Sequence, residues 1–122
     1  MEEAVAAIRE IWATFAGAPM DHRGRFYTFT LPPFPGAGPP PGDIPIYLAS
    51  IGEKNVELTA EIADGWLPMG FVPGAMEEYR PWLEEGFRRA GNGKGFHNFE
   101  IAANVHVEVE DDVKAEIGRA HV

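Results

Sequence analysis

Short apolar runs alternate with amphipathic helical stretches along most of the chain, and this alternation constrains the fold more than any other feature. Strands are expected at 46–49, 66–69 and 99–109, and apolar residues at helical spacing predict helices at 2–16, 53–63 and 76–90. Strands that alternate with helices form a parallel sheet with right-handed crossovers. Three such strands cannot shield both faces and both edges of the sheet. The sequence therefore predicts an α/β fold, the middle to C-terminal part of a (β/α)8 TIM barrel.

The segment 99–109 carries the clearest strand signal. Its odd-numbered residues, from Phe99 to Val109, are apolar, whereas Glu100 and His106 share the other face. If the apolar face packs against helices, the even face points into the barrel, and His106 becomes a weak candidate for contact with a substrate. A packed or solvated histidine is the simpler interpretation.

Three further local signals complete the expected elements. Aromatic and β-branched residues in 24–32 favour a short strand or an extended arm. Pro81 should kink or divide the helix at 76–90, because proline removes a backbone donor. Asp111 or Asp112 is expected to cap a helix that starts at Val113.

A Pro-rich stretch at 32–45 cannot form a helix or a central strand. The simplest interpretation is a stiff surface loop inserted into the barrel. A ligand for a polyproline-binding domain is an alternative, but glycines interrupt any regular polyproline run.

The composition excludes several classes of partner. A net charge of −9 argues against nucleic acid and against anionic membranes, since both need clustered Lys and Arg. No apolar run approaches the ~20 residues of a membrane span. The absence of cysteine excludes disulfides and thiolate metal sites and is compatible with the cytoplasm. The histidines show no metal-ligand spacing.

The two ends of the chain suggest a partial domain at 1–116 followed by a non-native tail. The last six residues, IGRAHV at 117–122, do not suit the helix expected from Val113. They are similar to the translation of a sequencing-adapter oligonucleotide in a metagenomic read. A genuine tail is the alternative.

The segment Ala49-Ser50-Ile51-Gly52 is the strongest candidate for a binding site. It follows a strand and opens a helix, which places it on the ligand side of a parallel α/β fold. The first amides of the helix have no internal partner, and the helix dipole is positive there. Ser50 adds a hydroxyl donor, and Gly52 lets a ligand approach the backbone. A phosphate would fit, and a plain N-cap serine with a turn glycine is the alternative.

The chain also resembles a known family. EAVAAIREIW, HRGRFYTFTLPPFP, PIYLASIGEKNVELTAEIADGWLPMGF and EEYRPWLEEGFRRAG are similar to segments of the luciferase-like monooxygenase superfamily, in particular of its coenzyme F420-dependent oxidoreductases. The resemblance covers nearly all of 2–116 and implies part of a TIM barrel. It implies hydride transfer with F420, or with FMN as the alternative, to or from a small-molecule substrate, or a monooxygenase that uses reduced flavin with oxygen.

The same resemblance implies where the cofactor lies. The loop from Ala49 to Gly52 would help to hold its phosphate-bearing tail, and Met69 and Gly70 in the next loop would lie beside it. The family often has Gly-Gly or Gln-Gly where this chain has Ile51-Gly52, which puts one backbone contact in doubt. The catalytic residues of the family lie mostly in earlier strands, so none is assigned here.

Two other functions remain open from the residues alone. One is a fragment of a barrel lyase or isomerase that acts on a phosphorylated substrate. The other is a small Pro-rich interaction protein without enzymatic activity. On the resemblance, the isolated chain is expected to be inactive, and its full-length parent is compatible with a homodimer.

Overall fold

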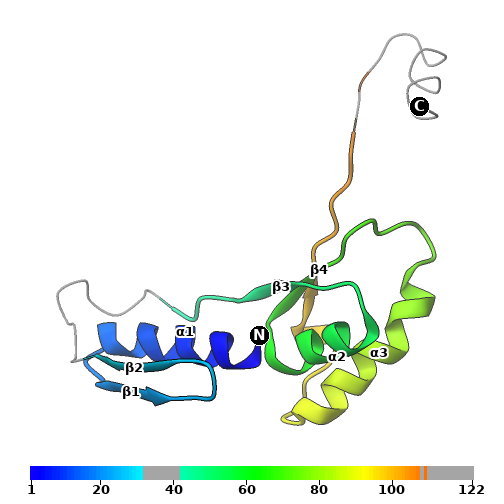
Figure 1. Ribbon diagram of the computed structural model, residues 1–122. Coiled ribbons are helices and arrows are strands. Elements are labelled where there is room, and N and C mark those ends of the chain that lie inside the picture. Colours follow the sequence, from blue (N-terminus) through cyan, green and yellow to red (C-terminus); the bar gives the residue numbers. More distant parts are fainter. Residues whose placement is uncertain (32–41, 108, 110–122) are drawn as a thin grey trace.

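The computed structural model describes residues 1–31, 42–107 and 109, which form an α/β unit and a helix with a β-hairpin beside it (Figure 1). The helices are α1 (Glu2–Phe15), α2 (Glu53–Ile62), α3 (Met76–Ala90) and a short 3-10 helix, η2 (Phe96–Asn98). The strands are β1 (Met20–Arg23), β2 (Thr28–Leu31), β3 (Tyr47–Ala49), β4 (Gly65–Leu67) and β5 (Glu100–Ile101).

The α/β unit is built on a parallel sheet in the order β3-β4-β5. Leu48, Trp66 and Ile101 are register partners and therefore lie on one face of the sheet. Trp66 is fully buried, and α2 and α3 cover this face with an apolar core. The core consists of Val56, Ala60, Trp66, Leu83, Phe87 and Phe99. The predicted alternation of parallel strands and covering helices is thus confirmed.

Helices α2 and α3 pack closely because the sequence supplies small residues at their crossing. A Cβ added at Gly86 of α3 would lie 2.2 Å from the carbonyl oxygen of Glu57 and 2.4 Å from the Cβ of Ala60. Only a residue without a side chain permits this separation. Helix α3 is continuous through Pro81, so the prediction that the proline divides the helix is wrong, whereas the alternative, a kink, stays a prediction.

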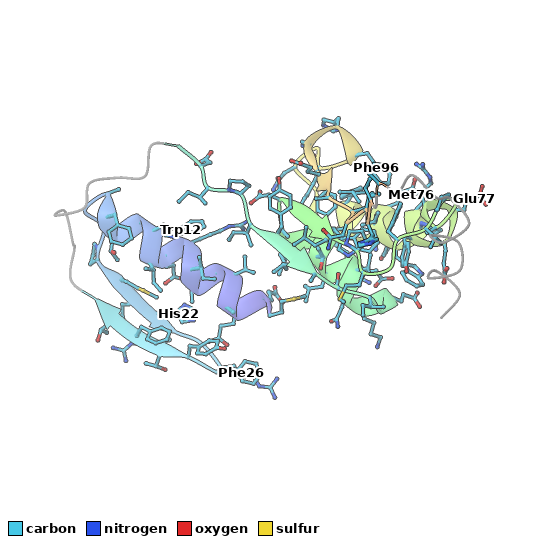
Figure 2. All side chains as sticks on the ribbon, turned by 90° about the horizontal axis from the view of Figure 1, so that it is seen from above. Trp12, His22, Phe26, Met76, Glu77 and Phe96 are labelled. Carbon is cyan, nitrogen blue, oxygen red and sulfur yellow. The ribbon has the colours of Figure 1, made fainter. Side chains whose placement is uncertain are left out.

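The α1–hairpin unit was only half predicted. Residues 24–32 were expected to form one strand or arm, but β2 pairs with an earlier strand, β1, in an antiparallel hairpin, and 24–27 form the turn. The alternate residues Met20 and His22 of β1 are buried, and His22 lies between the hairpin and α1 (Figure 2). Strand β1 was not predicted, because three of the four residues of MDHR are polar and the segment is too short to show a period.

The prediction of a long strand at 99–109 is wrong about the length of the strand. Only Glu100 and Ile101 form β5, and the ladder ends where the Ala102 amide donates to the Trp66 carbonyl. Strand β4 turns away after Leu67, so the residues beyond Ala102 have no pairing strand within the described part of the chain. The apolar side chains of Val105, Val107 and Val109 are therefore largely exposed.

The other boundaries agree with expectation to within a few residues. The helices predicted at 2–16, 53–63 and 76–90 and the strand at 46–49 are present, and β4 begins and ends slightly earlier than the predicted 66–69. The helix expected from Val113, the tail 117–122 and most of the Pro-rich stretch lie outside the described residues.

Candidate functional site

The carboxyl edge of the sheet brings the two predicted binding segments together. Ala49, at the end of β3, is the register partner of Leu67, at the end of β4. The loop 50–52 and the loop from 68 onward therefore leave neighbouring strands at the same edge. Ile51 and Met69 are exposed there, each by more than half of its surface.

The first turn of α2 has no side-chain cap. Gly52 is the N-cap residue, with an extended backbone, and among the residues that the structure describes no side chain accepts a hydrogen bond from the first-turn amides. A Cβ added at Gly52 would meet nothing within 4 Å, so the approach to these amides is open. Uncapped amides and a positive helix end form a site that favours an anion.

Ser50 has a different place from the one expected. Its side chain is buried, and its Oγ lies 2.9 Å from Oγ1 of Thr59. Because the Thr59 hydroxyl donates to the Asn55 carbonyl, the Ser50 hydroxyl is the donor in their shared bond. The hydroxyl thus points into α2 in this structure, and the backbone amides are the donors presented at the edge. The serine does not cap α2 either.

A buried tryptophan fixes the loop after β3. The indole Nε1–H of Trp66 donates to the Ser50 carbonyl at 2.9 Å. Trp66 also makes edge contacts with Phe71 and Tyr79, which anchors the loop after β4 to the same core. Between these anchors, Met69 and Gly70 are exposed, and Gly70 has a φ of 65°. One side chain therefore positions both loops of the candidate site.

Sequence reasoning passed over Lys54, which the structure places in the first turn of α2. Its side chain is exposed, and it follows Glu53, which carries the opposite charge in the same turn. Lys54 follows the N-cap Gly52 by two residues, and this spacing could have identified it as a candidate anion-binding residue. The weak candidate His106 lies in an exposed, extended segment beyond β5 and not in the sheet.

The sheet face opposite the helices carries a polar pair near the amino end of the strands. The Tyr47 hydroxyl donates to the Glu100 carboxylate at 2.5 Å, and this hydrogen bond, together with burial, raises the pKa of Tyr47. The tyrosine ring crosses β4 at Gly65, where an added Cβ would lie 2.2 Å from it. This pair is at the edge away from the two candidate loops.

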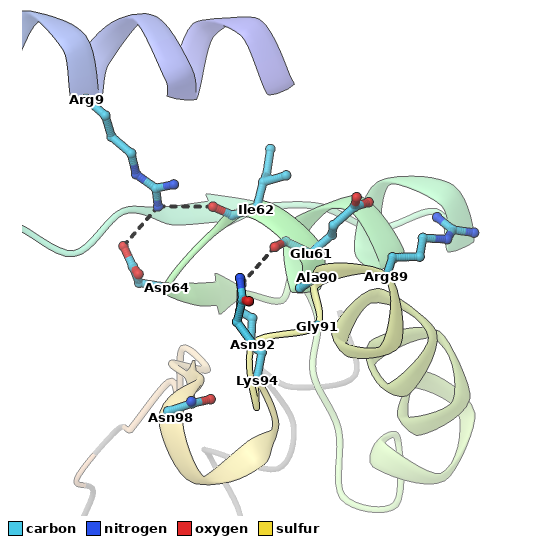
Figure 3. Close-up of a pocket in the computed structure, with 10 residues that line it drawn as sticks. All are labelled: Arg9, Glu61, Ile62, Asp64, Arg89, Ala90, Gly91, Asn92, Lys94 and Asn98. Carbon is cyan, nitrogen blue, oxygen red and sulfur yellow. Dashed lines mark hydrogen bonds and ion pairs between the residues drawn. The ribbon is translucent and has the colours of Figure 1, made fainter.

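The amino edge of the sheet contains a charged hollow (Figure 3). Two of its cations bind the end of α2: Arg9 donates to the Ile62 carbonyl, and Lys94 donates to the carbonyls of Glu61 and Ala63. These bonds satisfy carbonyls that have no partner within a helix. The glycine-rich segment 90–96 is therefore a helix-to-strand loop that caps α2, on the edge opposite the candidate site.

We expect Lys94→Met to lower the free energy of unfolding by about 1.5 kcal/mol, because it removes two charge-assisted bonds to the end of α2. Urea denaturation followed by circular dichroism would measure the change. Lys54→Met, at the positive end of the same helix, is the matched control and should cost no more than about 0.3 kcal/mol. Equal losses in both variants would contradict a capping role for Lys94.

Two further observations bear on the class of site. The described residues contain no group of three His, Cys, Asp or Glu side chains placed to hold a metal ion. No helix in the described ranges is long and apolar enough to cross a membrane.

The arrangement of loops and helices can now be compared with known proteins. Residues 1–119 match the family described as luciferase-like monooxygenase. The chain belongs to this family. The lyase or isomerase fragment and the Pro-rich interaction protein, both left open by the residues alone, are disfavoured by this membership.

Several proteins similar to this chain have names that refer to coenzyme F420. The chain is 37% identical, over 90% of its length, to a Mycobacterium tuberculosis protein whose name assigns it provisionally to the coenzyme F420-dependent oxidoreductases. It superposes with a TM-score of 0.73 and 25% identity on the F420-dependent tetrahydromethanopterin reductase of Methanopyrus kandleri, over 93% of this chain. An F420-dependent secondary alcohol dehydrogenase, solved with an F420-acetone adduct, gives a TM-score of 0.65 and 28% identity over 84% of this chain.

These comparisons confirm the predicted fold class and family. The structure is that of part of a TIM barrel, and the chain spans about a third of the length of the relatives it matches: 34% of the mycobacterial protein, 32% of the reductase and 29% of the dehydrogenase. Both solved structures are described as F420-dependent enzymes, and the mycobacterial relative carries a name of the same kind.

Proposed function

We propose that this chain is part of an oxidoreductase that uses coenzyme F420, and that the first turn of α2 holds the phosphate-bearing tail of the cofactor. The observation that carries the proposal is the uncapped, open first turn of α2 at the carboxyl edge of a parallel sheet. The F420 dependence of its relatives supports the choice of cofactor.

The donors at this edge suit a phosphate. The amides that follow Gly52 point out of the helix end, and Lys54 adds an exposed cation beside them. Glu53 opposes an anion, so the amides and Lys54 have to outweigh it. Met69 and Gly70 provide an exposed apolar wall on the neighbouring loop, while Ser50 acts by holding the loop against α2 through Thr59.

When bound, F420 supplies the hydride chemistry through its deazaflavin ring. The described residues bind and orient the tail, and we assign no acid or base among them. The isolated chain is accordingly proposed to bind the cofactor weakly and to be inactive. FMN, which also carries a phosphate, is the alternative cofactor for the same seat.

Replacing Gly52 by Asp should weaken F420 binding about tenfold while leaving the thermal midpoint unchanged or slightly raised. An aspartate at the N-cap accepts the first-turn amides itself and adds a negative charge where the phosphate would lie. Titration of the chain into F420, followed by fluorescence anisotropy, measures the affinity, and a parallel titration with FMN tests the alternative.

The matched control is Asn92→Asp, which adds the same charge at the opposite edge of the sheet, at an exposed residue with positive φ. This control should bind F420 as the unmodified chain does. If the Gly52→Asp chain bound F420 as tightly as the unmodified chain, the phosphate could not lie at this turn. If the chain bound FMN more tightly than F420, FMN would be the cofactor of this site.

A further inference from the structure

A buried histidine joins the hairpin to α1. His22, on β1, has a side chain that is only 10% exposed and lies between two carboxylates of α1 (Figure 2). Its Nε2 is 3.1 Å from Oε1 of Glu3, and its Nδ1 is 3.2 Å from Oε1 of Glu10. The Phe29 ring of β2 lies beside the imidazole, with a centroid separation of 6.4 Å. Both ring nitrogens therefore face acceptors.

Glu3 also holds the turn of the hairpin. Its carboxylate accepts the backbone N–H of Phe26 at 2.9 Å and that of Tyr27 at 2.8 Å. The turn is closed by a bond from the Gly24 N–H to the Tyr27 carbonyl. A Cβ at Gly24 would lie 1.8 Å from Oε1 of Glu3 and 2.7 Å from Nε2 of His22, so glycine permits this close approach. The turn and the imidazole thus depend on the same carboxylate.

The geometry favours the protonated form of His22. An imidazolium has two N–H donors and can satisfy Glu3 and Glu10 together, whereas a neutral imidazole has one donor and one lone pair. In the neutral form, one nitrogen lone pair would face a carboxylate oxygen at close to 3.1 Å. The other charged residues of the hairpin have partners other than His22, since Arg23 pairs with Asp21 and Arg25 lies over the Phe26 ring.

We propose that the β1–β2 hairpin is a proton-dependent latch on α1, closed by an imidazolium at His22 between Glu3 and Glu10 and released when that proton is lost. Because Glu3 contacts both the imidazole and the turn, a neutral ring that repels its carboxylate would displace Glu3, loosen its bonds to the Phe26 and Tyr27 amides and uncover the apolar residues of α1 beneath the hairpin. The turn, through Phe26, also borders a hollow that includes Leu58 of α2, so the latch closes over the junction of α1 and α2. This inference does not depend on the proposed cofactor.

The pKa shifts agree in sign with this geometry. The hydrogen bond that His22 donates to Glu10, and then the one that it donates to Glu3, raises the pKa of His22 above 6.5. Burial opposes ionisation of Glu3, but the Phe26 and Tyr27 amides and His22 outweigh it and lower the pKa of Glu3 below 4.5. The contribution of His22 is thus fully present below pH 6.5 and is lost as the pH rises through its folded pKa. That of Glu3 is present above pH 4.5 and is lost as the pH falls.

Amide hydrogen exchange of the 122-residue chain across pH 5.5 to 8.5, read by NMR as protection factors, tests the latch. The Phe26 and Tyr27 amides and the β1–β2 ladder should lose protection by about tenfold or more as the pH rises, while amides in α2 and α3 keep theirs. His22→Gln should abolish this pH dependence. His97→Gln, at an exposed histidine of η2, is the matched control and should retain it.

Glu10→Gln provides a milder variant, because Glu10 is 45% exposed and does not bind the turn. The NMR titration of the His22 ring should give a pKa above 6.5 in the unmodified chain and a lower value in this variant. Hairpin protection that does not change with pH, or a loss shared equally by α2 and α3, would overturn the latch. A His22 pKa at or below 6.5 would do the same.

Discussion

Trp66→Ala is expected to lower the free energy of unfolding by about 3–5 kcal/mol, the range for removing a large buried aromatic side chain. Trp66 is fully buried at the centre of the core, in edge contact with Phe71 and Tyr79. The substitution also leaves the buried carbonyl of Ser50 without its indole donor. Chemical denaturation followed by far-UV circular dichroism measures the loss.

Trp66→Phe helps to separate the two contributions, because it keeps an aromatic ring and most of the apolar volume but removes the N–H donor. It should cost about 1–3 kcal/mol, clearly less than the alanine variant. Since the donor holds the loop after β3, we also expect faster amide exchange at Ile51 and Gly52 in the phenylalanine variant. Unchanged stability in both variants would show that Trp66 does not organise this core.

Gly86→Ala should destabilise the chain by about 2 kcal/mol, although alanine is the better helix former by about 1 kcal/mol. The new methyl group would meet the backbone of Glu57 and the Cβ of Ala60 in α2, and neither is a flexible side chain that could move aside. The two helices would have to separate, which loosens the contacts of Leu83 and Phe87 with the core. Thermal and urea denaturation measure the effect.

Glu84→Ala is the matched control, because Glu84 is exposed two residues earlier in the same helix. It should change the free energy of unfolding by less than about 0.5 kcal/mol. A Gly86→Ala chain more stable than the unmodified one would mean that helix propensity outweighs the contact between α2 and α3.

The sequence predicted the elements whose signals are local. The apolar positions of α2 and α3 recur at helical spacing, and Gly91 follows α3 directly, so the bounds of α3 agree with its prediction at both ends. The parallel order also followed from alternation alone, because only crossovers can join parallel strands. Three strands that cannot shield their own sheet predicted part of a barrel, and the family resemblance implied the same fold.

Features that depend on a partner distant in sequence could not be predicted. The alternation in 99–109 indicates that the segment could form a strand, but the length of β5 depends on how far its neighbour β4 extends. Strand β4 pairs with only Glu100 and Ile101 before the chain turns away. The hairpin strand β1 depends on α1, whose Glu3 and Glu10 give His22 its place. The sequence of this short, mostly polar strand does not by itself show that it packs against α1.

The candidate site was predicted in position but not in detail. The residues from Ala49 to Gly52 and Met69-Gly70 do lie on neighbouring loops at the carboxyl edge, as strand order implied. The role of Ser50 was not visible, because its partner Thr59 lies nine residues later on a buried face of α2. Whether these residues hold a cofactor stays a prediction.

The contact between the Tyr47 ring and Gly65 makes the residues allowed at positions 47 and 65 depend on each other. Because the Tyr47 ring fills the space in which a side chain at 65 would lie, either position can enlarge only if the other shrinks. A mutational path from this sequence therefore has to change residue 47 before residue 65. We expect aligned homologues to show the two positions covarying, with glycine at 65 wherever an aromatic residue occupies 47.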